Sequence, residues 1–358
     1  MRRRLLVSCV TLVVVFALVE SAVRVRQYVR FGTTSQSYHD LEEHTASGLM
    51  VPKANAETGS IRVNPEGFRS PSIPLDKPAG TVRLAFLGGS TTFCAEVSSN
   101  AATWPHLVTE ELRRTHPDVS FDYLNAAAAG YTTADSLLNM RHRVAAYAPD
   151  VVVVYHGTND LVHLSRLAAI EVGLFDLESD VETDTWLSRN CMTWFLLKKN
   201  LRNRGRQARA AENTQAMPIA PGDIAVPFRG RLVPLLDEVA KTASLICLPT
   251  FATKVRTGQA QEAQMSAASS AIYYMPFFGT EEILAGYQQI NSTLREVAQG
   301  RDDVLLIEGE GSIPADEEHF ADTVHFLDAG SQLQAQRVVG SLESSPKFAA
   351  LLESASGN

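Results

Sequence analysis

The sequence predicts an α/β protein whose parallel sheet, of about five strands, carries helices on both faces. Short runs rich in β-branched residues recur along the chain, and none alternates cleanly between apolar and polar side chains. Strands that are buried on both faces have this appearance. Helix-length segments such as 104–114 and 134–147 separate the runs, and such alternation is typical of a parallel sheet. The strand-like runs are residues 82–87, 119–124, 151–155, 243–248 and 304–307.

The bulk composition is that of a globular enzyme. With 358 residues the chain has room for one large domain or two modest ones. Apolar residues make up 45% of it and charged residues 20%, which is unlike a disordered chain. The net charge of −8 argues against nucleic acid as a partner, because nucleic-acid binding requires a basic face. The sequence gives no indication of the oligomeric state.

The first 30 residues are expected to form a signal-anchor or transmembrane segment. Arginines at positions 2–4 precede an apolar run from Leu5 to Val19, which Glu20 interrupts before the run resumes as far as Val23. About 19 residues can just span a bilayer as a helix. The alternative is a cleaved signal peptide with a poor cleavage site around Glu20 and Ser21. Both interpretations place the body outside the cytoplasm, in the periplasm or at the cell surface.

Composition divides the rest of the chain. Residues 31–80 are polar and broken by prolines and glycines, which is typical of a juxtamembrane stalk and lead-in. The main domain is expected at 81–345, with insertions at about 161–232 and 253–280, and residues 346–358 form a tail. Cys94 and Cys191 could form a disulfide in an oxidising compartment, but the sequence does not establish that pairing.

A basic amphipathic stretch lies in the first insertion, at residues 194–209. It predicts a lid, or a surface that touches anionic membrane or glycan, or simply the solvated face of a helix. The basic residues of the stretch are Lys198, Lys199, Arg202, Arg204, Arg206 and Arg209.

A serine follows the first predicted strand of the main domain. The motif Gly88-Gly89-Ser90 lets the backbone turn tightly and leaves the Ser90 hydroxyl exposed, with its own N–H available to a developing oxyanion. A plain strand-to-helix loop with a capping serine is the alternative. The motif is neither GxSxG nor a phosphate-binding loop, because no Gly-Lys-Ser/Thr follows.

The next two strands also end in polar or flexible residues. Gly130 follows the second strand, where a glycine brings a backbone N–H close to a substrate or simply makes a turn. Asn159 follows the third strand, and its side-chain amide is either an oxyanion donor or the cap of the next helix. Because the carboxyl ends of parallel strands form one edge, an active site is expected where these residues meet.

An acid and a histidine stand near the C-terminus. Asp322 and His325 are three residues apart, and on a helical turn they would lie on the same side and hydrogen-bond. A carboxylate in that place fixes the imidazole tautomer and supports the imidazolium that forms when histidine takes a proton. We expect His325 to titrate near its ordinary pKa of about 6.5.

These residues follow one another in the order nucleophile, glycine, asparagine and Asp/His, and in this the chain resembles the SGNH hydrolases, also called GDSL-like lipases and esterases. The resemblance covers residues 64–342, and it looks closest to membrane-anchored bacterial members that carry GGST in place of GDS. Gly89 stands where the family usually has an aspartate, and Cys94 where a glycine is common. The blocks of the family correspond to Ser90, Gly130, Asn159, Asp322 and His325.

The resemblance implies a flavodoxin-like three-layer α/β/α sandwich and hydrolysis of an acyl ester, often on a carbohydrate. Ser90 would be the nucleophile and His325 the base, while Ser90, Gly130 and Asn159 would form the oxyanion hole. No cofactor or metal is expected. The substrate would be a small-molecule, lipid or glycan ester. An acyltransferase that modifies a cell-envelope glycan and a non-catalytic glycan-binding module remain as alternatives.

Overall fold

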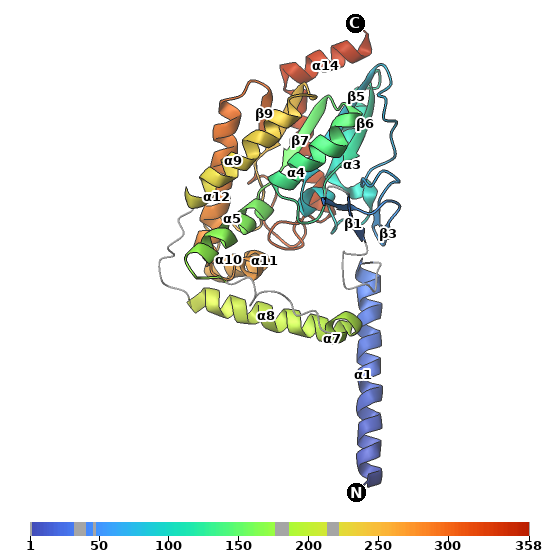
Figure 1. Ribbon diagram of the computed structural model, residues 1–358, viewed down its shortest axis with the longest axis vertical. Coiled ribbons are helices and arrows are strands. Elements are labelled where there is room, and N and C mark those ends of the chain that lie inside the picture. The colour runs from blue at the N-terminus through green and yellow to red at the C-terminus, as the bar shows by residue number, and fades with distance from the viewer. Residues whose placement is uncertain (1, 32–40, 46–47, 176–185, 213–221, 358) are drawn as a thin grey trace.

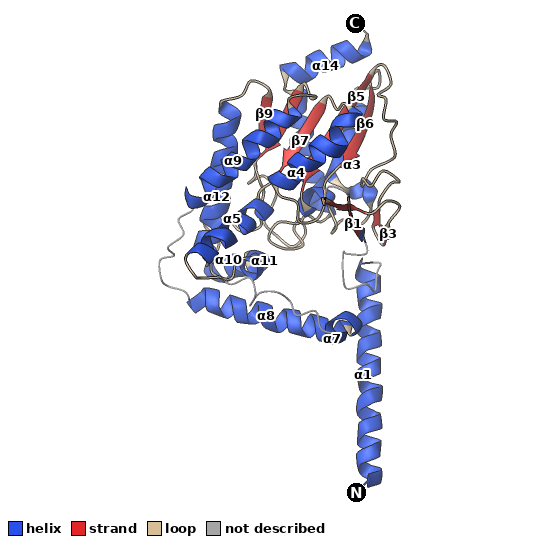
Figure 2. Cartoon of the chain, in the orientation of Figure 1, coloured by secondary structure: helices blue, strands red, loops and turns tan. Residues whose placement is uncertain are grey.

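The computed structural model describes residues 2–31, 41–45, 48–175, 186–212 and 222–357. A sheet covered by helices forms the body, and the long helix α1 (Arg2–Phe31) projects from one end of it (Figure 1). Strands lie in the interior of the body and helices surround them (Figure 2).

The central sheet has five parallel strands in the order β6-β5-β7-β8-β9. This is the strand order of flavodoxin-like sheets, so the predicted fold class and all five predicted strands are confirmed. Their side chains are mostly buried, which explains why the sequence runs do not alternate. The strands are β5 (Thr81–Gly88), β6 (Ser120–Asn125), β7 (Val151–Tyr155), β8 (Leu245–Pro249) and β9 (Val304–Ile307).

Helices cover both faces of the sheet. On one face α3 (Trp104–Thr115) packs against α13 (Asp328–Glu343). A second group packs together on the other face, and the expected helix at 134–147 continues from α4 into a π turn (Met140–Val144) and a 3₁₀ turn (Ala145–Tyr147). The second group is α4 (Thr133–Asn139), α5 (Thr158–Glu171), α9 (Gly222–Val239) and α12 (Thr280–Gln299).

The segment expected as stalk and lead-in packs against the domain from Leu41 onward. It forms two small antiparallel hairpins, and its apolar side chains Leu41, Ile61 and Val63 are buried with Phe93 of the domain. Residues 32–40 and 46–47 of this segment lie outside the described residues. The hairpin strands are β1 (Glu42–His44), β2 (Met50–Pro52), β3 (Glu57–Thr58) and β4 (Ile61–Arg62).

Both expected insertions contain helices. Part of the first insertion, at 176–185 and 213–221, lies outside the described residues, and the basic stretch at 194–209 forms part of α8. The expected tail is also helical, and it buries Phe348. The helices are α7 (Trp186–Asn190) and α8 (Met192–Glu212) in the first insertion, α10 (Gln261–Ala267) and α11 (Ser269–Tyr274) in the second, and α14 (Pro346–Ser356) in the tail.

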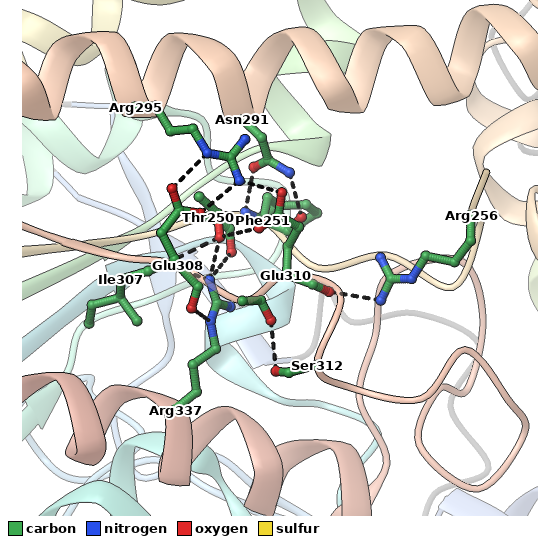
Figure 3. Close-up of polar contacts among 11 residues, drawn as sticks. Thr250, Phe251, Arg256, Asn291, Arg295, Ile307, Glu308, Glu310, Ser312 and Arg337 are labelled. Carbon is green, nitrogen blue, oxygen red and sulfur yellow. Dashed lines mark hydrogen bonds and ion pairs between the residues drawn. The ribbon is translucent and has the colours of Figure 1, made fainter.

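A charged network fixes the loops that follow β8 and β9 (Figure 3). Arg337 of α13 donates to the backbone carbonyls of Thr250 and Ile307, at 2.8 and 2.7 Å. Arg295 of α12 donates to Glu308 and, at 2.6 Å, to Glu310. Arg295 and Arg337 are half-buried, and each is paired with carboxylate or carbonyl oxygens of the two loops. The carboxyl ends of the two strands are therefore held by helices from both faces.

The sheet has a definite orientation relative to α1. A Cβ on Gly80, just before β5, would lie 3.2 Å from the carbonyl oxygen of Ala355, so α14 marks the amino end of the strand. In Figure 1, α14 lies at the end of the body opposite α1 and α8. The carboxyl ends of the strands are thus turned toward α8, α10 and α11.

Candidate active site

Ser90 lies at the carboxyl end of β5, in the first turn of the short helix α2 (Ser90–Phe93). The two preceding glycines are required by close packing. A Cβ on Gly88 would lie 2.1 Å from Oγ1 of Thr92, and one on Gly89 would lie 2.5 Å from Nδ2 of Asn159. Cys94 ends the turn in the left-handed region, at φ +62°. Tight packing and a sharp turn together present Ser90 at the edge of the sheet.

A continuous chain of hydrogen bonds joins the serine to the acid. Nε2 of His325 is 2.7 Å from Oγ of Ser90, and Nδ1 of His325 is 2.8 Å from Oδ2 of Asp322. Because a carboxylate only accepts, Nδ1 carries the proton and Nε2 is left to accept from the serine hydroxyl. Such a chain can move the serine proton to the imidazole.

The local geometry of this pair differs from the sequence expectation. Residues 321–324 form bends rather than a helical turn. Oδ1 of Asp322 accepts from the backbone N–H groups of Val324 and His325, at 2.9 and 3.0 Å, and this closes the turn. A side chain that bonds its own backbone two and three residues on replaces the helical hydrogen bonds. The expected pairing was right and its helical origin was wrong.

The loops after β6 and β7 meet beside Ser90. Nδ2 of Asn159 donates to the carbonyl oxygen of Tyr131 at 2.9 Å, and the same amide lies against Gly89. Gly130 adopts φ +78°, a conformation that other residues rarely take. Within the described part of the chain, the backbone N–H groups of Ser90 and Gly130 have no acceptor. The three expected oxyanion donors therefore lie where β5, β6 and β7 end, at one edge of the sheet: Ser90 begins α2, Gly130 lies in a loop and Asn159 is in the first turn of α5.

Residues 86–333 match the family model described as "GDSL-like Lipase/Acylhydrolase family". The chain belongs to the GDSL-like lipase/acylhydrolase family. The matched range contains Ser90, Gly130, Asn159, Asp322 and His325, and it spans most of the chain. As a member of this family, the protein is a serine hydrolase that acts on carboxylic esters.

Solved structures with similar shapes are esterases and hydrolases of low identity. An α/β hydrolase enzyme from the metagenome of Lake Arreo, Spain, is 16% identical, covers 73% of this chain and 94% of its own, and has a TM-score of 0.42. An acetylxylan esterase from Geobacillus stearothermophilus is 14% identical, covers 73% of this chain and 93% of its own, and has a TM-score of 0.41. A two-domain esterase active on acetylated mannans is 16% identical, covers 74% of this chain and 50% of its own, and has a TM-score of 0.38. No curated protein matches the sequence. The family assignment rests on the family model, since TM-scores this low do not establish a relationship.

The electrostatics of this GDSL-type site differ from the sequence expectation for His325. Burial lowers its pKa, but the carboxylates of Glu96 and Asp322 outweigh burial and raise the pKa above its ordinary value. Burial raises the pKa of Asp322, yet the charge of His325 and three hydrogen bonds lower it to about 2. The expectation that His325 titrates near 6.5 is therefore corrected upward, because the sequence could not place a second carboxylate nearby.

Glu96 is the residue of the site that sequence reasoning missed. Its Oε2 is buried and has no hydrogen-bond partner among the described residues. Burial raises its pKa, and His325 and Asp322 are the charges that act on it most strongly. It follows α2 by only a few residues. That position was the one available signal, since nothing in the local sequence distinguishes Glu96 from a surface glutamate.

Two further residues support the site from a distance. Arg69 of the lead-in is buried, and its Nη1 donates to the carbonyl oxygens of Phe93 and Cys94 at 2.8 and 2.6 Å, so it fixes the end of α2. Thr323 donates through Oγ1 to the carbonyl oxygen of Ala267 at 2.6 Å, which fastens the Asp322–His325 loop to the helices of the second insertion.

The cysteines do not pair. Cys94 and Cys191 are both free and buried. Cys94 ends the α2 turn that begins at Ser90, whereas Cys191 lies between α7 and α8, where its sulfur donates to Glu20 of α1. The disulfide that the sequence left open is therefore absent from the structure.

Proposed function

We propose that this family member is a membrane-anchored esterase in which Ser90 is the nucleophile. Ser90 attacks the ester carbonyl while His325 accepts its proton, and Asp322 holds the imidazole in the required tautomer. His325 then gives the proton to the departing alcohol. Water attacks the acyl-serine in the second half of the reaction and releases the acid. The observation that carries the proposal is the 2.7 Å contact from His325 to Ser90, continued at 2.8 Å to Asp322.

The oxyanion of the tetrahedral intermediate is assigned to three donors. The N–H groups of Ser90 and Gly130 are free of other acceptors in the described part of the chain, and the amide of Asn159 has a second N–H beyond the one given to Tyr131. Donors held in place before the charge develops need no reorganisation during the reaction. Gly130 supports this assignment because its positive φ is a backbone conformation that residues other than glycine rarely adopt, so the loop has its present shape only with a glycine there.

The proposed anchor is α1, and the proposed location of the body is extracytoplasmic. Residues Leu6–Arg26 are long and apolar enough to cross a bilayer. Glu20, which interrupts the apolar run, accepts from the backbone N–H groups of Met192 and Thr193 at 2.8 Å. Contacts between α1 and the body favour a retained anchor over a signal peptide cleaved near this residue.

The experiment is replacement of the nucleophile in the full-length protein. Ser90→Ala should remain folded and lose roughly 10⁴- to 10⁶-fold in turnover of p-nitrophenyl acetate. A fluorophosphonate probe should label wild type at Ser90 and leave the variant unlabelled. Ser72→Ala, which changes an exposed serine of the lead-in, is the matched control and should keep activity and label. Retained activity in Ser90→Ala, with label on another serine, would show that the nucleophile is elsewhere.

The substrate class is proposed as an acyl ester of a small molecule, lipid or glycan. A series of p-nitrophenyl esters from acetate to palmitate, followed by acetylated oligosaccharides, would define the acyl length and the alcohol. Membership of a family does not by itself name the ester, because substrate choice depends on the site.

A further inference from the structure

Helix α8 has an apolar stripe that the body does not cover. Trp194, Leu197 and Leu201 follow one another at spacings of three and four, so they share one face of the helix. Their side chains are 42%, 49% and 59% exposed. Trp186, at the start of α7, is 74% exposed. Large apolar side chains gathered on one exposed face mark a surface that contacts an apolar partner.

The opposite side of α8 faces the body. Met192 is buried, Phe195 and Leu196 are half-buried, and α8 contacts α11. At 3.6 residues per turn, Lys198 and Arg202 lie along one side of the apolar stripe, and Arg204, which is exposed, lies along the other. Six basic residues and one acidic residue, Glu212, occur in the sequence of the helix. An apolar face with basic flanks is the pattern of a helix that lies in the interface of a membrane with anionic headgroups.

The position of α8 relative to α1 agrees with that pattern. Glu20 of α1 accepts from the first N–H groups of α8, and Arg24 donates to the carbonyl oxygen of Asn190 at 2.8 Å. Figure 1 shows α8 running across the axis of α1, between the body and the free length of α1. Helix α1 thus leaves the body at the level of α8.

The depth at which Glu20 contacts α8 also agrees with a position in the membrane interface. Glu20 lies six residues before Arg26, the end of the apolar span, which is about 9 Å along a helix. Interfacial helices bury their apolar faces about 5–10 Å into the headgroup and acyl boundary. If α1 spans the bilayer, α8 lies at the depth where an amphipathic helix is stable.

We propose that α7 and α8 lie in the membrane interface, with Trp186, Trp194, Leu197 and Leu201 in contact with the lipid. This rests on the proposed anchoring by α1. Because the carboxyl ends of the strands are turned toward α8, the interfacial helix holds the edge that bears Ser90 toward the bilayer surface. The lipid bilayer that receives α1 is the partner.

Tryptophan fluorescence tests the proposal directly. The chain has three tryptophans; Trp104 is buried in the core, and the other two lie on α7 and α8. The full-length protein is inserted into vesicles whose phospholipids carry bromine on their acyl chains. Emission should fall roughly twofold relative to unbrominated vesicles, because only the two helix tryptophans reach the lipid. Vesicles that contain anionic phospholipid should quench more than purely zwitterionic ones.

A matched pair of variants makes the test specific. Leu197→Glu/Leu201→Glu places two charges on the apolar stripe and should abolish most of the lipid quenching of Trp194. Leu75→Glu/Val226→Glu places two charges on exposed apolar side chains elsewhere and should leave quenching unchanged. Both variants should hydrolyse a soluble p-nitrophenyl ester at the wild-type rate, since no substituted residue belongs to the site.

Alkaline extraction of the same vesicles separates this proposal from the proposed anchor. Retention of the protein, with tryptophans open to aqueous iodide and not quenched by brominated lipid, would overturn the interfacial helix while leaving the anchor intact. Protection from both quenchers would also overturn it, because a protein surface, such as a second copy, would then cover the stripe. Release of the protein by alkali would refute the anchor and the interfacial helix together. None of these outcomes bears on the role of Ser90.

Discussion

Two Asp-x-x-His pairs lie six residues apart in the same loop, and only one of them reaches Ser90, the proposed nucleophile. Nδ1 of His325 is 2.8 Å from Asp322, and Nδ1 of His319 is 2.6 Å from Asp316. Their spacing and their mutual hydrogen bonds are alike. Only His325 contacts Ser90. A carboxylate three residues before a histidine therefore fixes the imidazole by a hydrogen bond. The surrounding fold decides whether the other nitrogen of that imidazole lies next to a serine hydroxyl.

The fold separates the pairs through a tight reversal of the chain. Phe320 and Phe326 form an isolated antiparallel bridge, and both side chains are buried. The N–H of Leu327 donates to the carbonyl oxygen of His319 at 2.9 Å, so His319 lies at the open end of the reversal. His325 lies within it, where the ring of Phe326 beside it packs on Tyr155 of β7. Packing of the phenylalanines directs the second histidine, and not the first, toward β5.

The largest contrast is expected between the two histidines. His325→Ala should lose about 10⁴- to 10⁶-fold in turnover, because no base then accepts the serine proton. His319→Ala should stay within roughly twofold of wild type, since a partly exposed hydrogen-bonded pair away from the serine contributes little. Turnover of a p-nitrophenyl ester measures both. Equal losses in the two variants, with both proteins folded by circular dichroism, would mean that the loop acts through stability and that His325 is not the base.

A smaller contrast is expected between the two acids. Asp322→Asn should lose roughly 10²- to 10⁴-fold, because an amide no longer fixes the tautomer or supports the imidazolium, although the imidazole itself remains. Asp316→Asn is the matched control and should be nearly silent. The double variant Asp322→Asn/His325→Ala should be no worse than His325→Ala alone, since residues that act as a unit are not additive. Losses that multiplied would show that Asp322 acts independently of His325.

The comparison also shows what the sequence could predict. The five strands were predicted because buried parallel strands leave continuous apolar runs, a local signal. Ser90 and Asn159 were predicted as site residues because parallel strands end at one edge, which is a rule of topology. The spacing of Asp322 and His325 predicted their hydrogen bond, but Asp316 and His319 have the same spacing, so spacing alone does not choose between the two histidines.

Long-range contacts were beyond reach. The bonds from Arg69 to the end of α2 span 24 and 25 residues, and those from Glu20 to α8 span more than 170. Neither pairing has a local pattern, because a charged side chain finds its partner only once the chain is folded. The prediction of a helical turn at Asp322 was wrong for a different reason: its side chain accepts hydrogen bonds from nearby backbone N–H groups and so replaces the helical ones. Sequence reasoning therefore predicted the candidate catalytic residues and missed the long-range contacts that hold them in place.

The smallest predicted effect concerns Glu96, whose carboxyl acts on His325. A nearby carboxylate stabilises the imidazolium and so raises the pKa of His325. Because His325 must be neutral to accept the serine proton, kcat/KM falls on the acid side as His325 is protonated. The raised pKa places that fall above the ordinary value of about 6.5. Glu96→Gln removes the charge and keeps the shape of the side chain. The fall of kcat/KM on the acid side of the pH profile (its acid limb) should therefore move to lower pH by less than about one unit.

The matched control is Glu318→Gln, which removes an exposed charge close to the Asp316–His319 pair. It should leave the acid limb in place. Profiles of kcat/KM against pH for the two variants and the wild type measure the shift, while activity at the plateau should change little because Glu96 is not in the proton path. A limb that stayed fixed in Glu96→Gln would show that this carboxyl is neutral when His325 titrates. If the acid side of the kcat/KM profile moved equally in both variants, the overall charge of the loop, and not Glu96 in particular, would set the pKa of His325. The two Asp-x-x-His pairs would then differ only in their position.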